Sequence, residues 1–183
     1  LLLLLSAAPA HAAIVPGAAV DGPSNNIDTS RPDVDVAPDN SAALVYLKKD
    51  GGQNHPFISR FVNGAWGAPQ RVDSDSGNAA SGAHIAVANG GKVVVAYISG
   101  GNAVARISTG PGAGFGAEHI VQAGGSFTDV DLSPNGNGYV VAESSDDIFA
   151  ERLAGTAFSD VGAGALDSDQ TQVAGGSNRN VRI

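Results

Sequence analysis

The stretch Asp33-Val34-Asp35-Val36-Ala37 decides the fold, because it returns three times along the chain. In each copy a polar residue is followed by apolar residues at alternate positions, which is the period of a β-strand. We therefore expect a chain built from repeated all-β units. The later copies are His84-Ile85-Ala86-Val87-Ala88, Asp129-Val130-Asp131-Leu132-Ser133 and Asn180-Val181-Arg182-Ile183.

Three sets of residues give the length of the repeated unit. The apolar residues Val36, Val87, Leu132 and Ile183 are separated by 51, 45 and 51 positions. Arginines recur at a spacing of 46, and aromatic residues at spacings of 49 and 43. All three sets indicate a period in the mid-forties, which we take as the length of one scaffold unit. The recurring arginines are Arg60, Arg106 and Arg152, and the recurring aromatic residues are Trp66, Phe115 and Phe158.

Each unit contains four short apolar segments joined by turn residues. Asn63-Gly64 is the favoured pair for a tight hairpin, and the second segments (residues 43–47, 93–97 and 139–142) are nearly continuous apolar runs. Such runs are expected where both faces of a strand are buried. A four-stranded unit of this length predicts a β-propeller blade, with a β-sandwich as the alternative.

The repeats divide the chain. Three blades do not close a ring, and the chain ends inside a fourth repeat, so we expect a fragment of a larger propeller. Ala19-Val20-Asp21 precedes the first repeat as Arg71-Val72-Asp73 precedes the second, and is a candidate closing strand. The expected segments are a signal peptide (1–12), a linker with this strand (13–31) and a partial propeller (32–183), with blades 32–81, 82–127 and 128–178 and the start of the next at 179–183.

The N-terminus predicts export. Five leucines and a small-x-small triplet, Ala10-His11-Ala12, are typical of the end of a secretory signal peptide, and the run is too short to span a bilayer. We expect a truncated leader, a mature protein that begins near Ala13, and a secreted or cell-surface location. The chain has no cysteine, so stability must come from packing rather than from disulfides.

The charge composition limits the classes of molecule that we expect the protein to bind. Lys+Arg is 10 against Asp+Glu 18, a net charge of −8. Nucleic acids and anionic membranes require the opposite sign, so we expect neither nucleic-acid binding nor membrane insertion after signal removal. An extracellular carbohydrate or protein remains as the partner.

The stretches "RPDVDVAPDNSAALVYL", "SRFVNGAWGAP" and "DLSPNGNGYVVA" resemble the units of exported β-propeller repeat proteins of high-GC bacteria. The resemblance covers residues 31–183 and implies a scaffold with no attached activity. A weaker resemblance, to sialidase-like propellers, rests on "FVNGAW". That stretch has the Gly and Trp of the Asp-box turn but lacks its Ser/Thr and Asp, and the catalytic arginines and tyrosine of that class have no counterpart here.

The first residue of each repeat is the leading site candidate. In a propeller the innermost strands line a central channel, so four polar side chains would surround one channel mouth. These residues are therefore candidates for a ligand or cation site, whereas the alternative, which we favour, is that their side chains only hydrogen-bond strand ends (Asp33, His84, Asp129 and Asn180).

A second candidate is the loop Asp73-Ser74-Asp75-Ser76-Gly77-Asn78, with oxygen donors at alternate positions. Hard oxygen ligands suit Ca²⁺, so Asp73 and Asp75 are candidate calcium ligands, although the loop lacks the distal glutamate of an EF-hand. A plain acidic loop is the alternative, and no other cofactor is expected. His55 and His119 have no repeated context and are expected at the surface.

No catalytic motif is present: no serine lies in a nucleophile elbow, and no glycine-rich loop leads from a strand into a helix. The sequence therefore favours a non-enzymatic, exported binding or surface scaffold module. The alternative is a sialidase-like or other glycoside-acting propeller whose catalytic residues lie outside this fragment.

Overall fold

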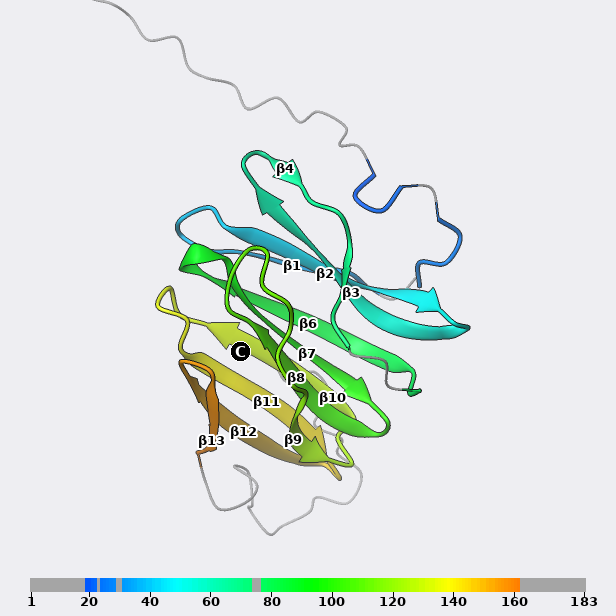
Figure 1. The fold of residues 1–183 in the computed structure, drawn as a ribbon. Coiled ribbons are helices and arrows are strands. Elements are labelled where there is room, and N and C mark those ends of the chain that lie inside the picture. Colours follow the sequence, from blue (N-terminus) through cyan, green and yellow to red (C-terminus); the bar gives the residue numbers. More distant parts are fainter. Residues whose placement is uncertain (1–18, 23, 29–30, 74–76, 162–183) are drawn as a thin grey trace, which may run out of the picture.

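The computed structural model describes residues 19–22, 24–28, 31–73 and 77–161. These residues are all-β: thirteen strands form three antiparallel sheets, and their only helical segment is the 3-10 turn η1 (Asn89–Gly91). The sheets follow one another along the chain and lie side by side, cyan, green and yellow in Figure 1. The all-β prediction is confirmed. The described residues form no closed ring, so the propeller stays a prediction.

Within each sheet the spatial order of the strands is their order in the chain, except that β5 pairs with β3 beside β4. Each sheet is thus a series of hairpins, as the turn residues predict. The first sheet contains β1 (Asp33–Val36), β2 (Ala42–Asp50), β3 (Gln53–Val62), β4 (Ala65–Trp66) and β5 (Gln70–Arg71); the second β6 (Ala80–Ala88), β7 (Lys92–Ser99), β8 (Asn102–Ser108) and β9 (His119–Ala123); the third β10 (Phe127–Leu132), β11 (Gly138–Ser144), β12 (Asp147–Ala154) and β13 (Ala157–Asp160).

The hairpin between β3 and β4 has the predicted two-residue turn. Asn63 and Gly64 have φ angles of 53° and 82°, and the flanking residues Val62 and Ala65 are paired. Two successive positive φ angles suit the right-handed twist of the strands, and Asn-Gly tolerates them best. Trp66 then packs edge to face on Phe61, with ring centroids 5.4 Å apart, and remains 37% exposed.

The core consists of two apolar clusters, one between the first and second sheets and one between the second and third. Strand β7 contributes to both. Val93, Val95 and Tyr97 belong to the first cluster, while Val94 and Ala96 belong to the second. Side chains alternate between the faces of a strand, so a strand buried on both faces must be apolar throughout. For β7 this confirms the interpretation of its continuous apolar run.

The sheet registers show that the three arginines do not occupy one repeated position. When the sheets are aligned on their first strands, Arg60 of the first sheet and Arg152 of the third occupy the same position in the third strand. In the second sheet that position holds Ile107, and Arg106 occupies the position that Ser59 holds in the first sheet. The prediction of a common arginine position is therefore wrong for Arg106. Adjacent residues of a strand point to opposite faces, so a shift of one position changes the sheet that a side chain meets.

Contacts made by the arginines agree with this register. Arg60 reaches forward to the second sheet, where Nη1 donates to the carbonyl of Gly91 at 2.7 Å and Nη2 to Oγ of Ser108 at 2.6 Å. Arg106 reaches back to the first sheet, donating through Nη1 to the carbonyl of Val72 at 2.8 Å. Both arginines therefore bind the sheets to each other through uncharged acceptors rather than through ion pairs.

The segment proposed to close a ring is not a strand: residues 19–22 adopt no regular structure. The segment is nevertheless attached to the first sheet. The carboxylate of Asp21 accepts hydrogen bonds from Oη of Tyr46 at 2.8 Å and from Nζ of Lys48 at 2.9 Å, and Ile27 forms an isolated antiparallel bridge with Lys48. The backbone of residues 19–21 thus pairs with no strand among the described residues, whereas the side chain of Asp21 is bound to the first sheet.

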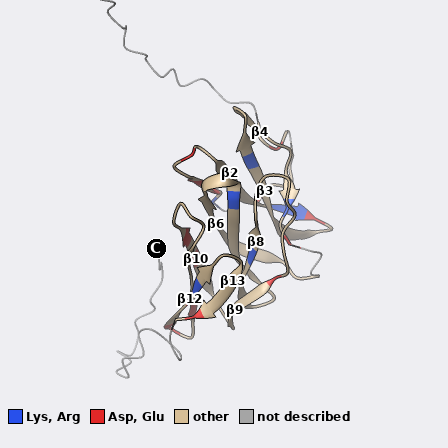
Figure 2. Ribbon diagram, turned by 60° about the vertical axis from the view of Figure 1, so that its left-hand side comes forward, with Lys and Arg blue, Asp and Glu red and all other residues tan. Residues whose placement is uncertain are grey.

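Most of the ribbon is uncharged, and the basic and acidic segments are scattered along it (Figure 2). Among the described residues, no helix has the length and apolar character needed to cross a membrane.

Candidate functional site

The structure brings together the first polar residues of three successive repeats. β1, β6 and β10 are the first strands of their sheets, and they carry Asp33, His84 and Asp129. Nδ1 of His84 lies 3.5 Å from Oδ2 of Asp33 and 3.7 Å from Oδ1 of Asp129. The imidazole therefore stands between two carboxylates that come from the sheets on either side of its own.

These three residues lie in a polar cleft of about 190 Å³. The cleft also receives Asp35 and Asp131, so four carboxylates and one imidazole line a small open volume. Its full lining is Asp33, Val34, Asp35, His84, Ile85, Ala86, Asp129, Val130 and Asp131, all from β1, β6 and β10. The ring of Phe127 covers one side of His84, with ring centroids 5.5 Å apart.

The surroundings of Asp33 favour its ionised form. Burial acts to raise the pKa of Asp33, but the hydrogen bonds from His84 and from the backbone N–H of Ile85 outweigh it, so this pKa lies below its ordinary value. A cleft of such groups attracts positive charge and repels anions. The arrangement suits the binding of a cation or of a positively charged group on a larger ligand.

Two of the residues that the sequence singled out cannot be compared with this geometry. Asn180, the fourth member of the predicted ring, and Asp75, of the predicted calcium loop, lie outside the described residues. Ligand binding by the ring and calcium binding by the loop both remain predictions.

Asp73, the other candidate calcium ligand, is buried and already bound to protein groups. Its Oδ2 lies 2.6 Å from Nδ1 of His55, and its Oδ1 accepts from Nε of Arg71 at 2.5 Å. Arg71 also pairs with Asp50 at 3.0 Å. Within the described part of the chain, no group of three or more His, Asp or Glu side chains is arranged to hold a metal ion.

The expectation that His55 is a surface residue is wrong, because only 4% of it is exposed. Its partner Asp73 lies 18 residues further along the chain, and only the fold brings the two together. His119 is closer to expectation, with 37% of its side chain exposed, but it also stacks on Phe158 at 4.3 Å and lies 2.5 Å from Oε2 of Glu151. Both histidines therefore have structural partners that sequence spacing did not reveal.

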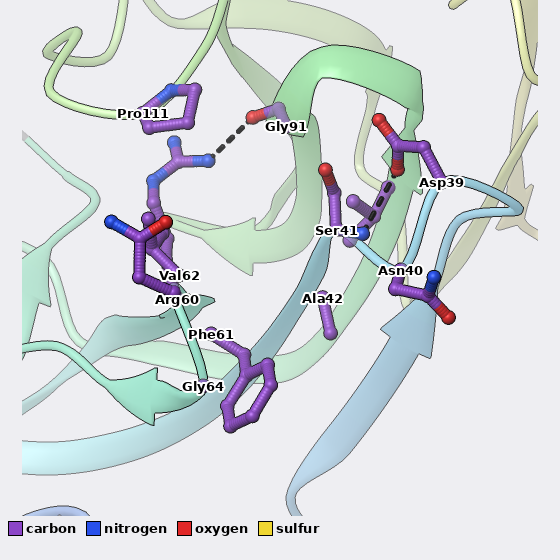
Figure 3. A pocket seen from close by; sticks show the side chains of 12 residues that line it. Asp39, Asn40, Ser41, Ala42, Arg60, Phe61, Val62, Gly64, Gly91 and Pro111 are labelled. Atoms are coloured by element: carbon purple, nitrogen blue, oxygen red, sulfur yellow. Dashed lines mark hydrogen bonds between the residues drawn. The ribbon is translucent and has the colours of Figure 1, made fainter.

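A cavity of about 320 Å³ between the first and second sheets was not expected from the sequence (Figure 3). Arg60 lies along one wall, with its guanidinium beside Pro111 and Gly91, and Asp39 and Ser41 lie on the opposite side. Burial lowers the pKa of Arg60, and its Nε is buried without a hydrogen-bond partner among the described residues. The acidic Asp39 makes this cavity a poor anion site despite the arginine.

A groove of about 600 Å³ lies at the outer side of the second and third sheets. Phe115, His119 and Phe158 contribute aromatic surface, and Thr109 and Thr156 contribute hydroxyl groups. Phe115 and Phe158 are two of the three aromatic residues that recur in the sequence. Because His119 stacks on Phe158, one face of the Phe158 ring is covered by the protein itself.

Comparison with known proteins shows the fold alone. No family model matches the chain, and no curated protein matches its sequence. Its structure is similar to the crystal structure of an unknown-function protein from Dyadobacter fermentans DSM 18053, with a TM-score of 0.50 and 16% sequence identity. The match covers 64% of this chain and 35% of that protein, so the chain spans well under half the length of its structural neighbour. The chain is thus an all-β protein of three four- to five-stranded antiparallel sheets, structurally similar to a bacterial protein of unknown function.

Proposed function

We propose that the chain is part of an exported β-propeller that acts as a non-enzymatic binding or surface scaffold module. The propeller is supported by three consecutive antiparallel sheets whose first strands, β1, β6 and β10, meet along one side of the molecule. In a propeller these strands line the central channel. Export rests on the leader-like residues 1–12.

The observation that carries a binding role is the meeting of Asp33, His84 and Asp129 in one polar cleft. Part of this approach is structural, since the carboxylate of Asp33 also accepts a hydrogen bond from the backbone N–H of Ile85 in the neighbouring sheet at 3.1 Å. Because the cleft is acidic, the ligand that fits best bears a positive charge, such as the lysine or arginine side chain of an extracellular protein. The net charge of −8 would favour the approach of such a partner.

The alternative, a glycoside-acting propeller enzyme, requires catalytic residues outside this chain. No observation on the described residues favours it over the binding module.

Amide NMR titration of the chain tests the proposal, with argininamide as the probe and the uncharged isostere citrullinamide as its control. We expect argininamide to shift the amides of His84, Ile85 and Val130 with about millimolar affinity, since one small cation gains little beyond the entropy that binding costs. Citrullinamide should leave them unchanged.

The matched variants are Asp129→Asn, which removes one carboxylate from the cleft, and Asp160→Asn, which removes an exposed carboxylate from β13 of the same sheet. The first should weaken the argininamide response and the second should not. Equal responses to argininamide and citrullinamide, or an undiminished response in Asp129→Asn, would disprove the cationic ligand. A response to calcium chloride alone would identify the cleft as a metal site instead.

A further inference from the structure

The groove of about 600 Å³ on the second and third sheets has the composition of a small-ligand site. It is separate from the acidic cleft, which is lined by β1, β6 and β10. Its walls come from β8, β9, β13 and the loops beside them, and the three strands lie close together in Figure 2. Sites for small ligands measure about 300–1,000 Å³ and combine apolar walls with a few convergent polar groups. The groove contains both.

Two of the recurring aromatic residues form the apolar walls. Phe115 packs against the core cluster between the first and second sheets, and Phe158 packs against the cluster between the second and third. Both remain partly exposed and line the groove. The ring of His119 lies parallel to that of Phe158, with an angle of 5° between the ring planes. The walls are therefore aromatic rings held in place by the core, which suits a flat apolar ligand surface.

Glu118 presents a carboxylate to the groove in a fixed position. Its Oε2 accepts a hydrogen bond at 2.9 Å from Oη of the fully buried Tyr97. Glu118 itself is exposed, and its Oε1 has no hydrogen bond within the described part of the chain. One oxygen thus anchors the carboxylate to the core of the second sheet, and the other remains open to a ligand.

The loop between β8 and β9, which forms one wall, is held by its own sheet. The N–H of Gly116 donates to the carbonyl of Ile107 at 2.8 Å, and the carbonyl of Gly116 accepts from Nε of Arg106 at 2.8 Å. Oγ of Ser108 donates to the carbonyl of Ala113 at 3.0 Å. A wall that is already ordered lowers the entropy that ligand binding costs.

Three further polar groups of the groove have no hydrogen bond to any described residue: Oγ1 of Thr109, Oγ1 of Thr156 and Nδ1 of His119. The other nitrogen of His119, Nε2, lies 2.5 Å from Oε2 of Glu151. Nε2 therefore carries the proton, and Nδ1 of the neutral ring is an acceptor. Hydroxyl groups both donate and accept. This mixture of donors and acceptors matches the hydroxyl groups of a sugar, whereas a cation brings donors alone and an anion acceptors alone.

We propose that this groove binds a neutral carbohydrate. The C–H groups of the sugar ring lie on the rings of Phe115 and Phe158. Its hydroxyl groups bind Oε1 of Glu118 and the hydroxyls of Thr109 and Thr156. Acidic sugars are disfavoured, because the carboxylate of Glu118 repels them. This inference does not depend on the cationic ligand proposed for the acidic cleft.

NMR titration of the full chain tests the site with three neutral trisaccharides of different hydroxyl geometry: cellotriose, maltotriose and the N-acetylglucosamine trimer. We expect at least one of them to shift the amides of Phe115, Glu118 and Thr156 with about millimolar affinity, because exposed hydrogen bonds gain little beyond the entropy that binding costs. The amides of Ile85 and Val130, in the acidic cleft, should not shift. Saturation of the aromatic protons should transfer to the ring C–H protons of the bound sugar.

Two variants remove single groups from the site. Thr156→Val should weaken binding of that trisaccharide about two- to tenfold, the effect of one lost hydrogen bond, without changing the melting temperature. Glu118→Gln keeps an acceptor for Tyr97 but loses the charge, and should weaken binding about tenfold, since hydrogen bonds to charged acceptors are stronger. Ser159→Ala is the matched control: it removes an exposed hydroxyl from β13 outside the groove and should leave the affinity unchanged.

The proposal is overturned if none of the three trisaccharides shifts these amides, or if Thr156→Val and Glu118→Gln bind as tightly as the unmodified chain. Shifts produced by tetramethylammonium chloride and not by the sugars would also overturn it, because the aromatic walls would then hold a cation. None of these results alters the response of the acidic cleft to argininamide, so the two sites are tested separately.

Discussion

Nη1 of Arg106 donates a 2.8 Å hydrogen bond to the carbonyl oxygen of Val72, which lies 34 residues earlier, directly after β5 of the neighbouring sheet. The same guanidinium donates through Nε to the carbonyl of Gly116 at 2.8 Å, and only 4% of the arginine is exposed. The buried guanidinium thus satisfies two carbonyl groups, one in the loop between β8 and β9 and one directly after β5 of the first sheet. Contacts of this kind, in addition to apolar packing, fix how neighbouring sheets meet.

Arg106→Met should lower the free energy of unfolding by about 1–3 kcal/mol, because it leaves the buried carbonyl of Val72 without its donor. Arg152→Met is the matched control: the exposed Arg152 has a different register position, and its change should stay within about 0.5 kcal/mol. Urea unfolding followed by tryptophan fluorescence measures both. Equal losses in the two variants would contradict the structural difference between these arginines.

Gly138→Ala should destabilise the third sheet. A Cβ at Gly138 would lie 2.0 Å from the carbonyl oxygen of Asp131 and 2.8 Å from Cδ2 of Leu132, so β10 and β11 would have to separate. The expected cost is about 1–3 kcal/mol, typical of overpacking. Gly114→Ala, where a Cβ meets nothing within 4 Å, should leave the melting temperature unchanged or slightly raised. A harmless Gly138→Ala would show that the two strands approach less closely.

Alkaline pH should destabilise the protein through Tyr46 and Tyr97. Burial, then the hydrogen bonds to Asp21 and Glu118 respectively, raise the pKa of both phenols above the ordinary value of 10. Above pH 10 the unfolded chain releases these protons and the folded chain retains them, so stability falls as pH rises, and below pH 10 the two groups contribute no slope. The melting temperature should therefore drop between pH 10 and 11.

Tyr97→Phe isolates the contribution of the fully buried phenol. The variant should melt lower than the parent at pH 8, because the bond to Glu118 is lost, yet its melting temperature should fall less steeply above pH 10. An unchanged slope would mean that this phenol ionises equally well in the folded and unfolded chain.

Much of the strand architecture could be predicted from local sequence. Alternation around Asp33, the Asn63-Gly64 turn and the continuous apolar run of β7 each reflect interactions within or beside one hairpin. The arginine register could not be predicted in this way. It depends on hairpin lengths, and β2 and β3, with 9 and 10 residues, are longer than β7 and β8, with 8 and 7. Equal spacing of 46 residues therefore conceals a change of face.

The candidate site was predictable to the extent that it follows the repeat. Asp33, His84 and Asp129 share a position relative to their strands, so their meeting follows once the first strands are adjacent. The burial of His55 against Asp73 could not be foreseen, because it depends on the antiparallel pairing of β5 with β3, which brings the residue after β5 opposite His55. The sequence on either side of His55 and of Asp73 contains no motif that predicts their contact.

The contacts between sheets also have symmetry consequences. At the first junction the carboxylates belong to one sheet and the backbone donors to the other, so the two surfaces are unlike. β1 also exposes Val34 and Val36, each at 60%. Unlike surfaces cannot pair across a two-fold axis. If copies of the chain associate in the way that its neighbouring sheets do, a carboxylate surface of one copy therefore meets a backbone-donor surface of another, and the copies join head to tail. Such association produces closed rings or growing filaments rather than isolated two-fold dimers.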